Sequence, residues 1–205
     1  MNYIFIHGLG QTDESWDKVI TTLGVQNKHC PNLKSLLNSK TPTFNNLYMA
    51  FKQYCDKFST PLNFCGISLG GILALKYTIE NPDKVNSLIL IGIQYKIPTL
   101  LFTLQGIVFK CLPQSTFAST GFTKTDFITL TNSMKYFNFE KELSGVKCKS
   151  MVICGNDDKA NKKASVELSK KLLNSKLYLI SNAKHEVNID SPEELTSLFN
   201  DFYFQ

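Results

Sequence analysis

The sequence predicts an α/β protein in which a mostly parallel sheet of about six strands is flanked by helices. Short apolar runs alternate along the chain with segments whose apolar residues recur at helical spacing, as in strands joined by crossover helices. A serine between glycines also stands where one such run gives way to a helical segment. Because 205 residues can bury one sizeable core, residues 1–205 are expected to form a single domain.

These patterns place the individual elements. Strands are expected over residues 2–6, 62–65, 86–91, 149–154 and 176–180, with a weak edge strand near 26–30. Helical spacing predicts helices over residues 15–23, 44–54, 161–173 and 192–204, and one more that continues from the serine turn. This last helix is expected to stop at Asn81-Pro82, because proline breaks a helix interior.

The charge pattern argues against a nucleic-acid partner. The formal net charge is +5, yet all 22 basic residues are lysines, and they are scattered along the chain. Short pairs at 162–163 and 170–171 fall on a predicted helix surface, which is typical of a solvated face. The absence of arginine removes the bidentate clamps that hold carboxylates and phosphates, so a polyanionic substrate is disfavoured.

Cysteine usage and the N-terminal sequence favour a cytoplasmic protein. The six cysteines show neither C-x-x-C pairs nor metal-ligand spacing, so no metal is expected. The chain begins at once with a strand and lacks a basic region followed by a long apolar segment. The longest apolar stretch, residues 97–113, is interrupted by Gln105, Gly106 and Lys110, so no stable membrane insertion is expected.

The serine turn reads Gly66-Ile67-Ser68-Leu69-Gly70, directly behind the apolar run 62–65. A side chain at the tip of a very tight strand-to-helix turn forces strained dihedral angles, and side chains two residues to either side would collide. Glycine at both flanking positions is what such a turn needs. The turn lifts the Ser68 oxygen over a helix N-terminus, where free N–H groups favour negative charge. The alternative is an ordinary Gly/Ser turn without chemistry.

Three polar features follow other predicted strands. His7-Gly8-Leu9-Gly10 follows the first strand, Gly155-Asn156-Asp157-Asp158 the strand at 149–154, and His185 the last strand. Because sites in open α/β sheets form outside the carboxyl ends of the strands, these features should meet at one edge. The order Ser, Asp, His, together with the serine turn, resembles the α/β-hydrolase fold superfamily over nearly the whole chain.

The resemblance implies a role for each of these residues. Ser68 would be the nucleophile, His185 the general base and acid, and Asp158 the residue that orients the imidazole. The acid usually stands third after the strand-ending glycine, which selects Asp158 over Asp157. The backbone N–H groups of Leu9 and Leu69 would form the oxyanion hole. No cofactor or metal is required.

The resemblance also bears on the parts of the chain outside the triad. The superfamily usually opens with an antiparallel pair of strands, so a chain that starts at the His-Gly strand is expected to be a trimmed version. Residues 93–145, which interrupt the strand–helix alternation and are rich in aromatic and aliphatic residues, correspond to a helical lid. Packing of this segment onto the sheet edge is the alternative to a lid.

The expected activity is hydrolysis of a small or medium carboxylic ester or thioester through an acyl-enzyme, with a small-molecule acyl substrate as the partner. Two alternatives stay open. The same triad serves C–C bond cleavage, elimination and cofactor-free peroxidase chemistry in relatives, and some relatives are non-catalytic small-molecule binders. The natural substrate, its chain length and the oligomeric state are left open by the sequence.

Overall fold

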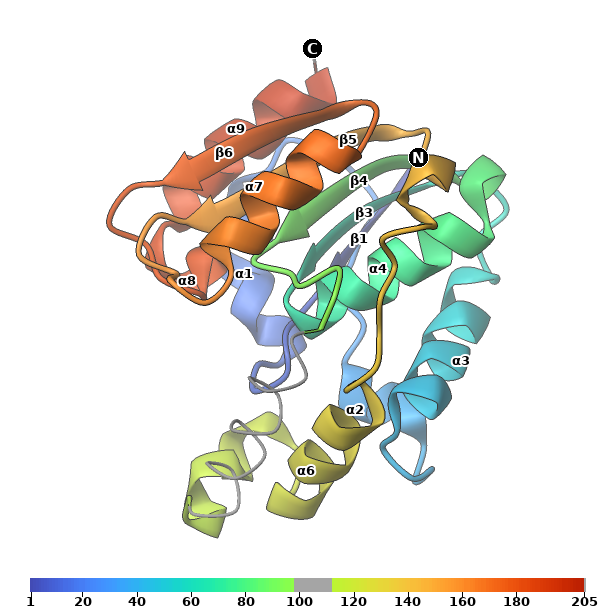
Figure 1. Ribbon diagram of the computed structural model, residues 1–205, viewed down its shortest axis with the longest axis vertical. Coiled ribbons are helices and arrows are strands. Elements are labelled where there is room, and N and C mark those ends of the chain that lie inside the picture. Colours follow the sequence, from blue (N-terminus) through green and yellow to red (C-terminus); the bar gives the residue numbers. More distant parts are fainter. Residues whose placement is uncertain (98–111, 205) are drawn as a thin grey trace.

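The computed structural model describes residues 1–97 and 112–204, and its centre is one all-parallel sheet of six strands in the order β2-β1-β3-β4-β5-β6 (Figure 1). The strands are β1 (Asn2–Ile6), β2 (Lys28–His29), β3 (Leu62–Ile67), β4 (Val85–Ile91), β5 (Lys149–Gly155) and β6 (Ser175–Ile180). The predicted fold class is therefore confirmed. The order places β3, which leads to the serine turn, near the middle of the sheet between β1 and β4.

Helices cover both faces of this sheet. One face carries α3 (Phe44–Cys55), α4 (Leu69–Glu80) and α7 (Lys162–Lys171), whose apolar residues pack together with strand residues in one core. The other face carries the 3-10 helix η1 (Asp13–Trp16), α1 (Asp17–Thr22), α8 (Val187–Asp190) and α9 (Pro192–Phe204), which enclose a second core. The predicted helix at 15–23 is thus split into a 3-10 turn and a short α-helix.

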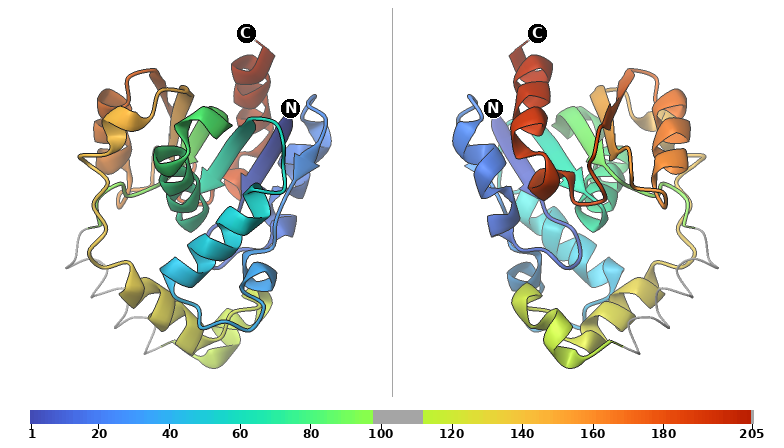
Figure 2. Two further views of the ribbon diagram at one scale, coloured as in Figure 1. Left: turned by 90° about the vertical axis from the view of Figure 1, so that its right-hand side faces the viewer. Right: turned by 90° about the vertical axis from the view of Figure 1, so that its left-hand side faces the viewer.

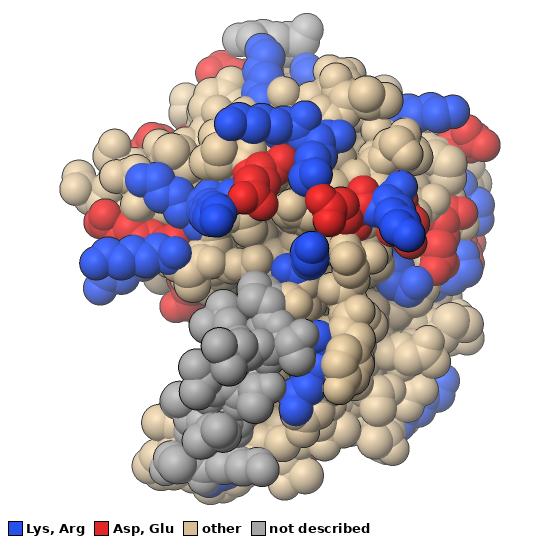
Figure 3. Space-filling model, in the orientation of Figure 1, with Lys and Arg blue, Asp and Glu red and all other residues tan. Residues whose placement is uncertain are grey.

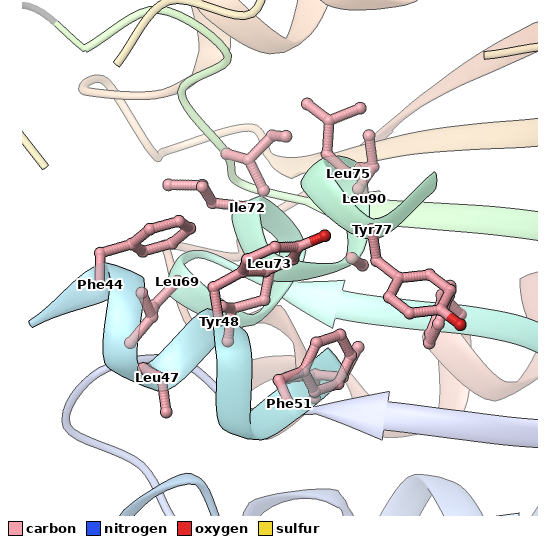
Figure 4. Close-up of a cluster of buried hydrophobic side chains, with 14 of the residues drawn as sticks. Phe44, Leu47, Tyr48, Phe51, Leu69, Ile72, Leu73, Leu75, Tyr77 and Leu90 are labelled. Carbon is pink, nitrogen blue, oxygen red and sulfur yellow. The ribbon is translucent and has the colours of Figure 1, made fainter. Parts of the chain in front are cut away.

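The two cores follow from the two-residue period of the strands. In β4, Leu88 and Leu90 enter the first core, whereas Ile89 and Ile91 enter the second. Figure 4 shows the first core, in which aromatic and aliphatic side chains of α3 and α4 meet next to β4. Full burial of each such side chain contributes about 1.5–3 kcal/mol to the stability of the fold. The packed sheet and helices therefore provide a stable base for the loops at the strand ends.

Shorter helices complete the chain. α2 (Leu33–Leu37) was not predicted, and η2 (Pro82–Lys84) follows the end of α4 at Glu80, where the Asn81-Pro82 stop was expected. Among the described residues, the remaining ones are η3 (Gln114–Thr120), α6 (Lys124–Ser133) and η4 (Leu143–Gly145). No helix within the described ranges is both long enough and apolar enough to cross a membrane.

The segment containing α6 lies apart from the sheet, alongside α2 and the start of α3 (Figures 1 and 2). Lys34 of α2 forms an ion pair with Asp126 of α6 at 2.9 Å, and the Phe44 N–H group donates to Ser133 Oγ at 2.8 Å. Residues 98–111, which form part of the predicted lid at 93–145, lie outside the described residues. These two contacts attach the first turn and the last residue of α6 to α2 and α3.

Candidate active site

Ser68 occupies the turn between β3 and α4 in a strained backbone conformation. Its φ of 52° and ψ of −119° are unusual for a residue with a side chain, and such outliers cost about 1–3 kcal/mol each. Two backbone hydrogen bonds hold the turn: Ser68 N–H donates to the Ile91 carbonyl at 2.9 Å, and Ile72 N–H donates to the Ser68 carbonyl at 3.1 Å. Ser68 therefore stands at the N-terminus of α4, half-buried, beside the end of β4.

The glycines of the turn are required by contacts with backbone atoms. A Cβ atom on Gly66 would lie 2.5 Å from the Gly70 carbonyl oxygen, so the predicted collision across the turn occurs at this position. A Cβ atom on Gly70 would lie 2.2 Å from the Ile6 carbonyl oxygen of β1. The second glycine is thus required by the neighbouring strand, a contact that the sequence pattern alone did not predict.

The loop after β1 lies against this turn. A Cβ atom on Gly8 would lie 3.4 Å from Ser68 Cβ. His7 is buried, and burial lowers its pKa, so it is neutral near pH 7. Its Nε2 accepts a bond from the Leu33 N–H group at 3.1 Å, which leaves Nδ1–H to donate to the Gly8 carbonyl at 2.9 Å. His7 therefore shapes the loop and joins it to α2.

Leu9 and Leu69, the two predicted oxyanion donors, flank this contact between the loop and the turn. Leu69 is the first residue of α4, where an N–H group has no partner in its own helix. Among the described residues, no backbone or side-chain acceptor is hydrogen-bonded to the N–H group of either leucine.

Asp158 and His185 meet at the ends of β5 and β6. His185 Nδ1 lies 2.7 Å from Asp158 Oδ2. Close packing brings the two loops together: a Cβ atom on Gly155 would lie 2.0 Å from the Lys184 carbonyl oxygen, and Asp157 N–H donates to the Ala183 carbonyl at 3.0 Å. Of the two neighbouring aspartates, Asp158 contacts the histidine, whereas Asp157 is exposed.

The environment of Asp158 keeps its carboxylate ionised. Its side chain is 5% exposed, whereas that of His185 is 39% exposed. Burial raises the pKa of Asp158, but hydrogen bonds from His185 and Asn161 outweigh it, so that the pKa lies below its ordinary value. An ionised Asp158 fixes the His185 tautomer with the proton on Nδ1, which leaves Nε2 as the basic nitrogen.

Ser68 and the Asp158–His185 pair share a neighbour without being bonded to one another in this structure. Ser68 N–H bonds to Ile91, and the next residue, Gly92, would place a Cβ atom 3.1 Å from His185 Nδ1. Within the part of the chain that the structure describes, no hydrogen bond joins the Ser68 hydroxyl to His185. In unliganded sites such bonds are often long and shorten only when substrate binds.

Two residues of this site were missed by sequence reasoning. Gln11, 5% exposed, accepts a bond from Gly8 N–H at 3.1 Å and donates to Glu186 Oε1 and Asn188 Oδ1, each at 3.1 Å. It therefore bridges the loop after β1 and the loop after β6. Asn161 contacts Asp158 and His185. Neither residue belongs to a motif. Gln11 bonds to residues far away in the sequence, and the contacts of Asn161 with Asp158 and His185 form only once the chain is folded.

Two further features of the described residues concern charge and metal ligands. Lysines and acidic residues are interspersed on the face shown in Figure 3, without a continuous basic surface. Within residues 1–97 and 112–204, no three His, Cys, Asp or Glu side chains converge as ligands for a metal ion.

The chain matches no protein-family profile and no curated protein sequence, but many solved structures share its fold. MenH from S. aureus has a TM-score of 0.81 at 17% identity, with 98% of this chain and 92% of that chain covered. A putative lipase from Acinetobacter baumannii AYE has a TM-score of 0.78 at 18% identity, with 99% and 83% covered. An α/β-hydrolase enzyme from the metagenome of lagoon sediments at Mar Chica, Morocco, has a TM-score of 0.77 at 22% identity, with 99% and 90% covered.

These similarities show that the chain has the α/β-hydrolase fold, as its motifs predicted. At such low identity they establish the fold and leave the chemistry to be argued from the residues of this chain.

Proposed function

We propose that this protein is a serine hydrolase that cleaves a small or medium carboxylic ester or thioester through an acyl-enzyme. The observation that carries the proposal is the 2.7 Å contact between His185 and a buried, ionised Asp158, on the strand ends next to a strained Ser68. Strained backbone of this kind persists where the surrounding structure enforces it and is concentrated at active sites.

In the proposed mechanism, Ser68 Oγ attacks the substrate carbonyl carbon while His185 Nε2 accepts its proton. The oxygen of the tetrahedral intermediate receives hydrogen bonds from the Leu9 and Leu69 N–H groups. Collapse of the intermediate breaks the bond to the alcohol or thiol, which takes the proton from His185. A water molecule then attacks the acyl-enzyme with the same assistance, and this step releases the acid and regenerates Ser68.

Asp158 supports both halves of this cycle through electrostatics. It stabilises the imidazolium that forms after each proton transfer, without accepting the proton itself. Because its pKa is held below the ordinary value, it remains a carboxylate throughout the neutral pH range.

The described part of residues 93–145 suits a lid over this site. Phe127 of α6 lies close to the loop after β1, since a Cβ atom on Gly10 would be 3.9 Å from the Phe127 ring. The Phe117 and Phe127 rings pack edge to face with their centroids 4.7 Å apart, and the Phe122 and Phe127 ring centroids are 6.2 Å apart. This buried aromatic cluster contacts the loop after β1 at Gly10, and apolar side chains next to that loop favour an apolar acyl group.

The test is hydrolysis of p-nitrophenyl esters of graded acyl length by the wild type and by Ser68→Ala. The wild type is expected to release nitrophenol in steady state, with a rate that depends on chain length and so measures the acyl pocket. Ser68→Ala should lose this activity while its thermal unfolding stays close to that of the wild type. Equal rates for both proteins would refute the role of Ser68.

A further inference from the structure

Asn161 stands at the start of α7 but does not use its side chain to cap that helix. Asparagine is among the best N-cap residues because its side-chain oxygen accepts a bond from one of the first free N–H groups. No such bond forms here. The helix begins instead with backbone bonds from Lys162 N–H to the Asp158 carbonyl and from Ser165 N–H to the Asn161 carbonyl, both at 2.9 Å. The side chain is therefore available for another role.

Both ends of the Asn161 amide group are hydrogen-bonded, the nitrogen to Asp158 and the oxygen to Gln94. Asn161 Nδ2 lies 3.0 Å from Asp158 Oδ1 and 2.8 Å from Asp158 Oδ2. Asn161 Oδ1 accepts a bond from Gln94 Nε2 at 2.9 Å. Gln94 is oriented in turn, because the same Nε2 donates to the Ala160 carbonyl at 2.8 Å. Gln94 thus determines which end of Asn161 faces the carboxylate, and that end is the donor.

Asn161 also fixes the rotation of the carboxylate relative to the imidazole. Its backbone N–H group donates to Asp158 Oδ1 at 3.2 Å, in addition to the side-chain bonds. Asn161 Nδ2 lies 3.1 Å from His185 Nδ1. Since Nδ1–H donates to Asp158, Asn161 and His185 are two donors that converge on one carboxylate oxygen. Hydrogen bonds to a charged group are roughly twice as strong as those between neutral groups.

We propose that Asn161 is a positioning residue for the Asp158–His185 pair, and that the donation of its side chain to Asp158 maintains the geometry needed for proton transfer. The inference rests on the proposed function of Ser68 and His185. It assigns to Asn161 a role distinct from helix capping, with Gln94 as the residue that orients it.

Other ionisable groups of these loops are directed elsewhere. Lys162 Nζ donates to Asn156 Oδ1 at 2.7 Å, Glu186 accepts from Gln11, and Asp190 accepts from Lys184 N–H at 2.8 Å. Burial raises the pKa of Cys154 to about 11, so this thiol stays neutral. Asp158 and His185 are therefore the pair through which a change at Asn161 would act.

The substitutions Asn161→Ser, Asn161→Ala and Asn161→Asp distinguish a helix-capping role from a hydrogen-bond-donating role, because the two roles predict a different order of damage among the three variants. Capping ranks Asp and Ser with Asn, and Ala lowest. Donation ranks Ser first, since its hydroxyl can still donate, then Ala, and Asp lowest, since its carboxylate repels Asp158. We expect kcat to fall about 10-fold in Asn161→Ala and about 100-fold in Asn161→Asp, as small misplacements of catalytic groups do, with KM unchanged.

The pH profile and a matched capping control complete the test. In Asn161→Asp the acid limb of kcat/KM should move to higher pH, because a second carboxylate beside the imidazole favours its protonated form. Thr43→Ala removes an ordinary side-chain cap, the 3.2 Å bond from Asn46 N–H at the start of α3, and should lower stability without moving kcat or the profile. A kcat in Asn161→Asp equal to that of the wild type, or above that of Asn161→Ala, would overturn the proposal.

A readout without turnover separates this proposal from the proposed function. The chain has only three histidines, so the proton NMR signal of His185 Nδ1–H can be assigned by substitution of the other two. The signal should shift or broaden in Asn161→Ala and Asn161→Asp and stay in place in Thr43→Ala. If Ser68→Ala and the wild type hydrolyse esters equally, the function fails while the signal still decides on Asn161. An unchanged signal in both Asn161 variants refutes the positioning role.

Discussion

The two halves of the candidate site are built by different means. The nucleophile half is fixed by backbone packing: Gly66 and Gly70 leave no space for a Cβ atom, and Ser68 is held at a φ of 52°. In the acid–base half, close packing at Gly155 brings the two loops together, whereas hydrogen bonds among Asp158, His185 and Asn161 orient the side chains. Close packing tolerates no added atom, whereas a hydrogen-bond network can be weakened step by step. Substitution of the turn glycines should therefore abolish the first half outright, whereas changes to the hydrogen-bonded side chains should weaken the second half by different amounts.

The largest effect is expected from Gly70→Ala. Its Cβ atom would lie 2.2 Å from the Ile6 carbonyl oxygen and 2.6 Å from the Ile6 carbonyl carbon, so β1 or α4 must move. We expect the free energy of unfolding to fall by more than about 4 kcal/mol, the range of severe core disruptions, with activity lost. Urea unfolding measures this.

Gly145→Ala is the matched control, because nothing lies within 4 Å of a Cβ atom at that position. Its stability should stay within about 0.5 kcal/mol of the wild type, as is usual for substitutions away from tight packing. Equal stability of the two variants would show that the turn is not built by steric exclusion.

Asp158→Asn should lower kcat by up to about 10⁴-fold, because an amide lets the imidazole take the wrong tautomer. The adjacent Asp157→Asn is the control: Asp157 is exposed and its side chain does not contact His185, so ester hydrolysis should stay near the wild-type rate. Steady-state kinetics on a p-nitrophenyl ester measures both. The reverse order would assign the acid to Asp157.

Gln11→Ala tests whether the two halves depend on each other, because Gln11 bridges them. Loss of its bonds to Gly8, Glu186 and Asn188 should loosen the loop after β1, lowering kcat about 10-fold and the stability by about 1–3 kcal/mol, the cost of buried groups left unpaired. Gln53→Ala, on the exposed side of α3, is the control and should change neither quantity. A Gln11→Ala variant that matches Gln53→Ala would show that the halves are independent.

The smallest effect concerns pH, which acts on the acid–base half through Asp158. The pKa of Asp158 is lower in the folded chain than its ordinary value of 3.8. Its contribution to stability is therefore present above about pH 4 and is lost as the pH falls through the folded-state pKa. Unfolding free energies measured from pH 7 to pH 3 should decline less in Asp158→Asn than in the wild type. A decline of the same size in both would contradict this assignment.

Much of the fold could be predicted from the sequence because its patterns are local. The inner strands β1, β3, β4 and β5 show as short apolar runs because they are buried on both faces, whereas the edge strands β2 and β6 are less buried. The serine turn has a steric signature of its own. The helix α2 was missed because five residues with Leu33 and Leu37 as the buried ones are too few to show a period. The spacing of apolar residues also could not show that the predicted helix at 15–23 is divided into η1 and α1.

The network around the acid was less predictable. Ser68, Asp158 and His185 follow strand ends and could be proposed from the order of their motifs. In the sequence, Asn161 looks like an ordinary residue at the start of a helix. Only the structure shows that its amide group does not cap the helix and donates to Asp158 instead. Gln11 joins Gly8 to Glu186 and Asn188, which lie 175 and 177 residues beyond Gln11 in the chain, so no local pattern could have revealed this bridge.

The most direct measurement of the central claim is covalent labelling by a fluorophosphonate probe, followed by mass spectrometry of the digested protein. The wild type should gain one phosphonyl group on the peptide that contains Ser68, Ser68→Ala should gain none, and Asp158→Asn should label far more slowly. An unlabelled wild type, or equal labelling of Ser68→Ala, would contradict the assignment of Ser68 as an activated nucleophile.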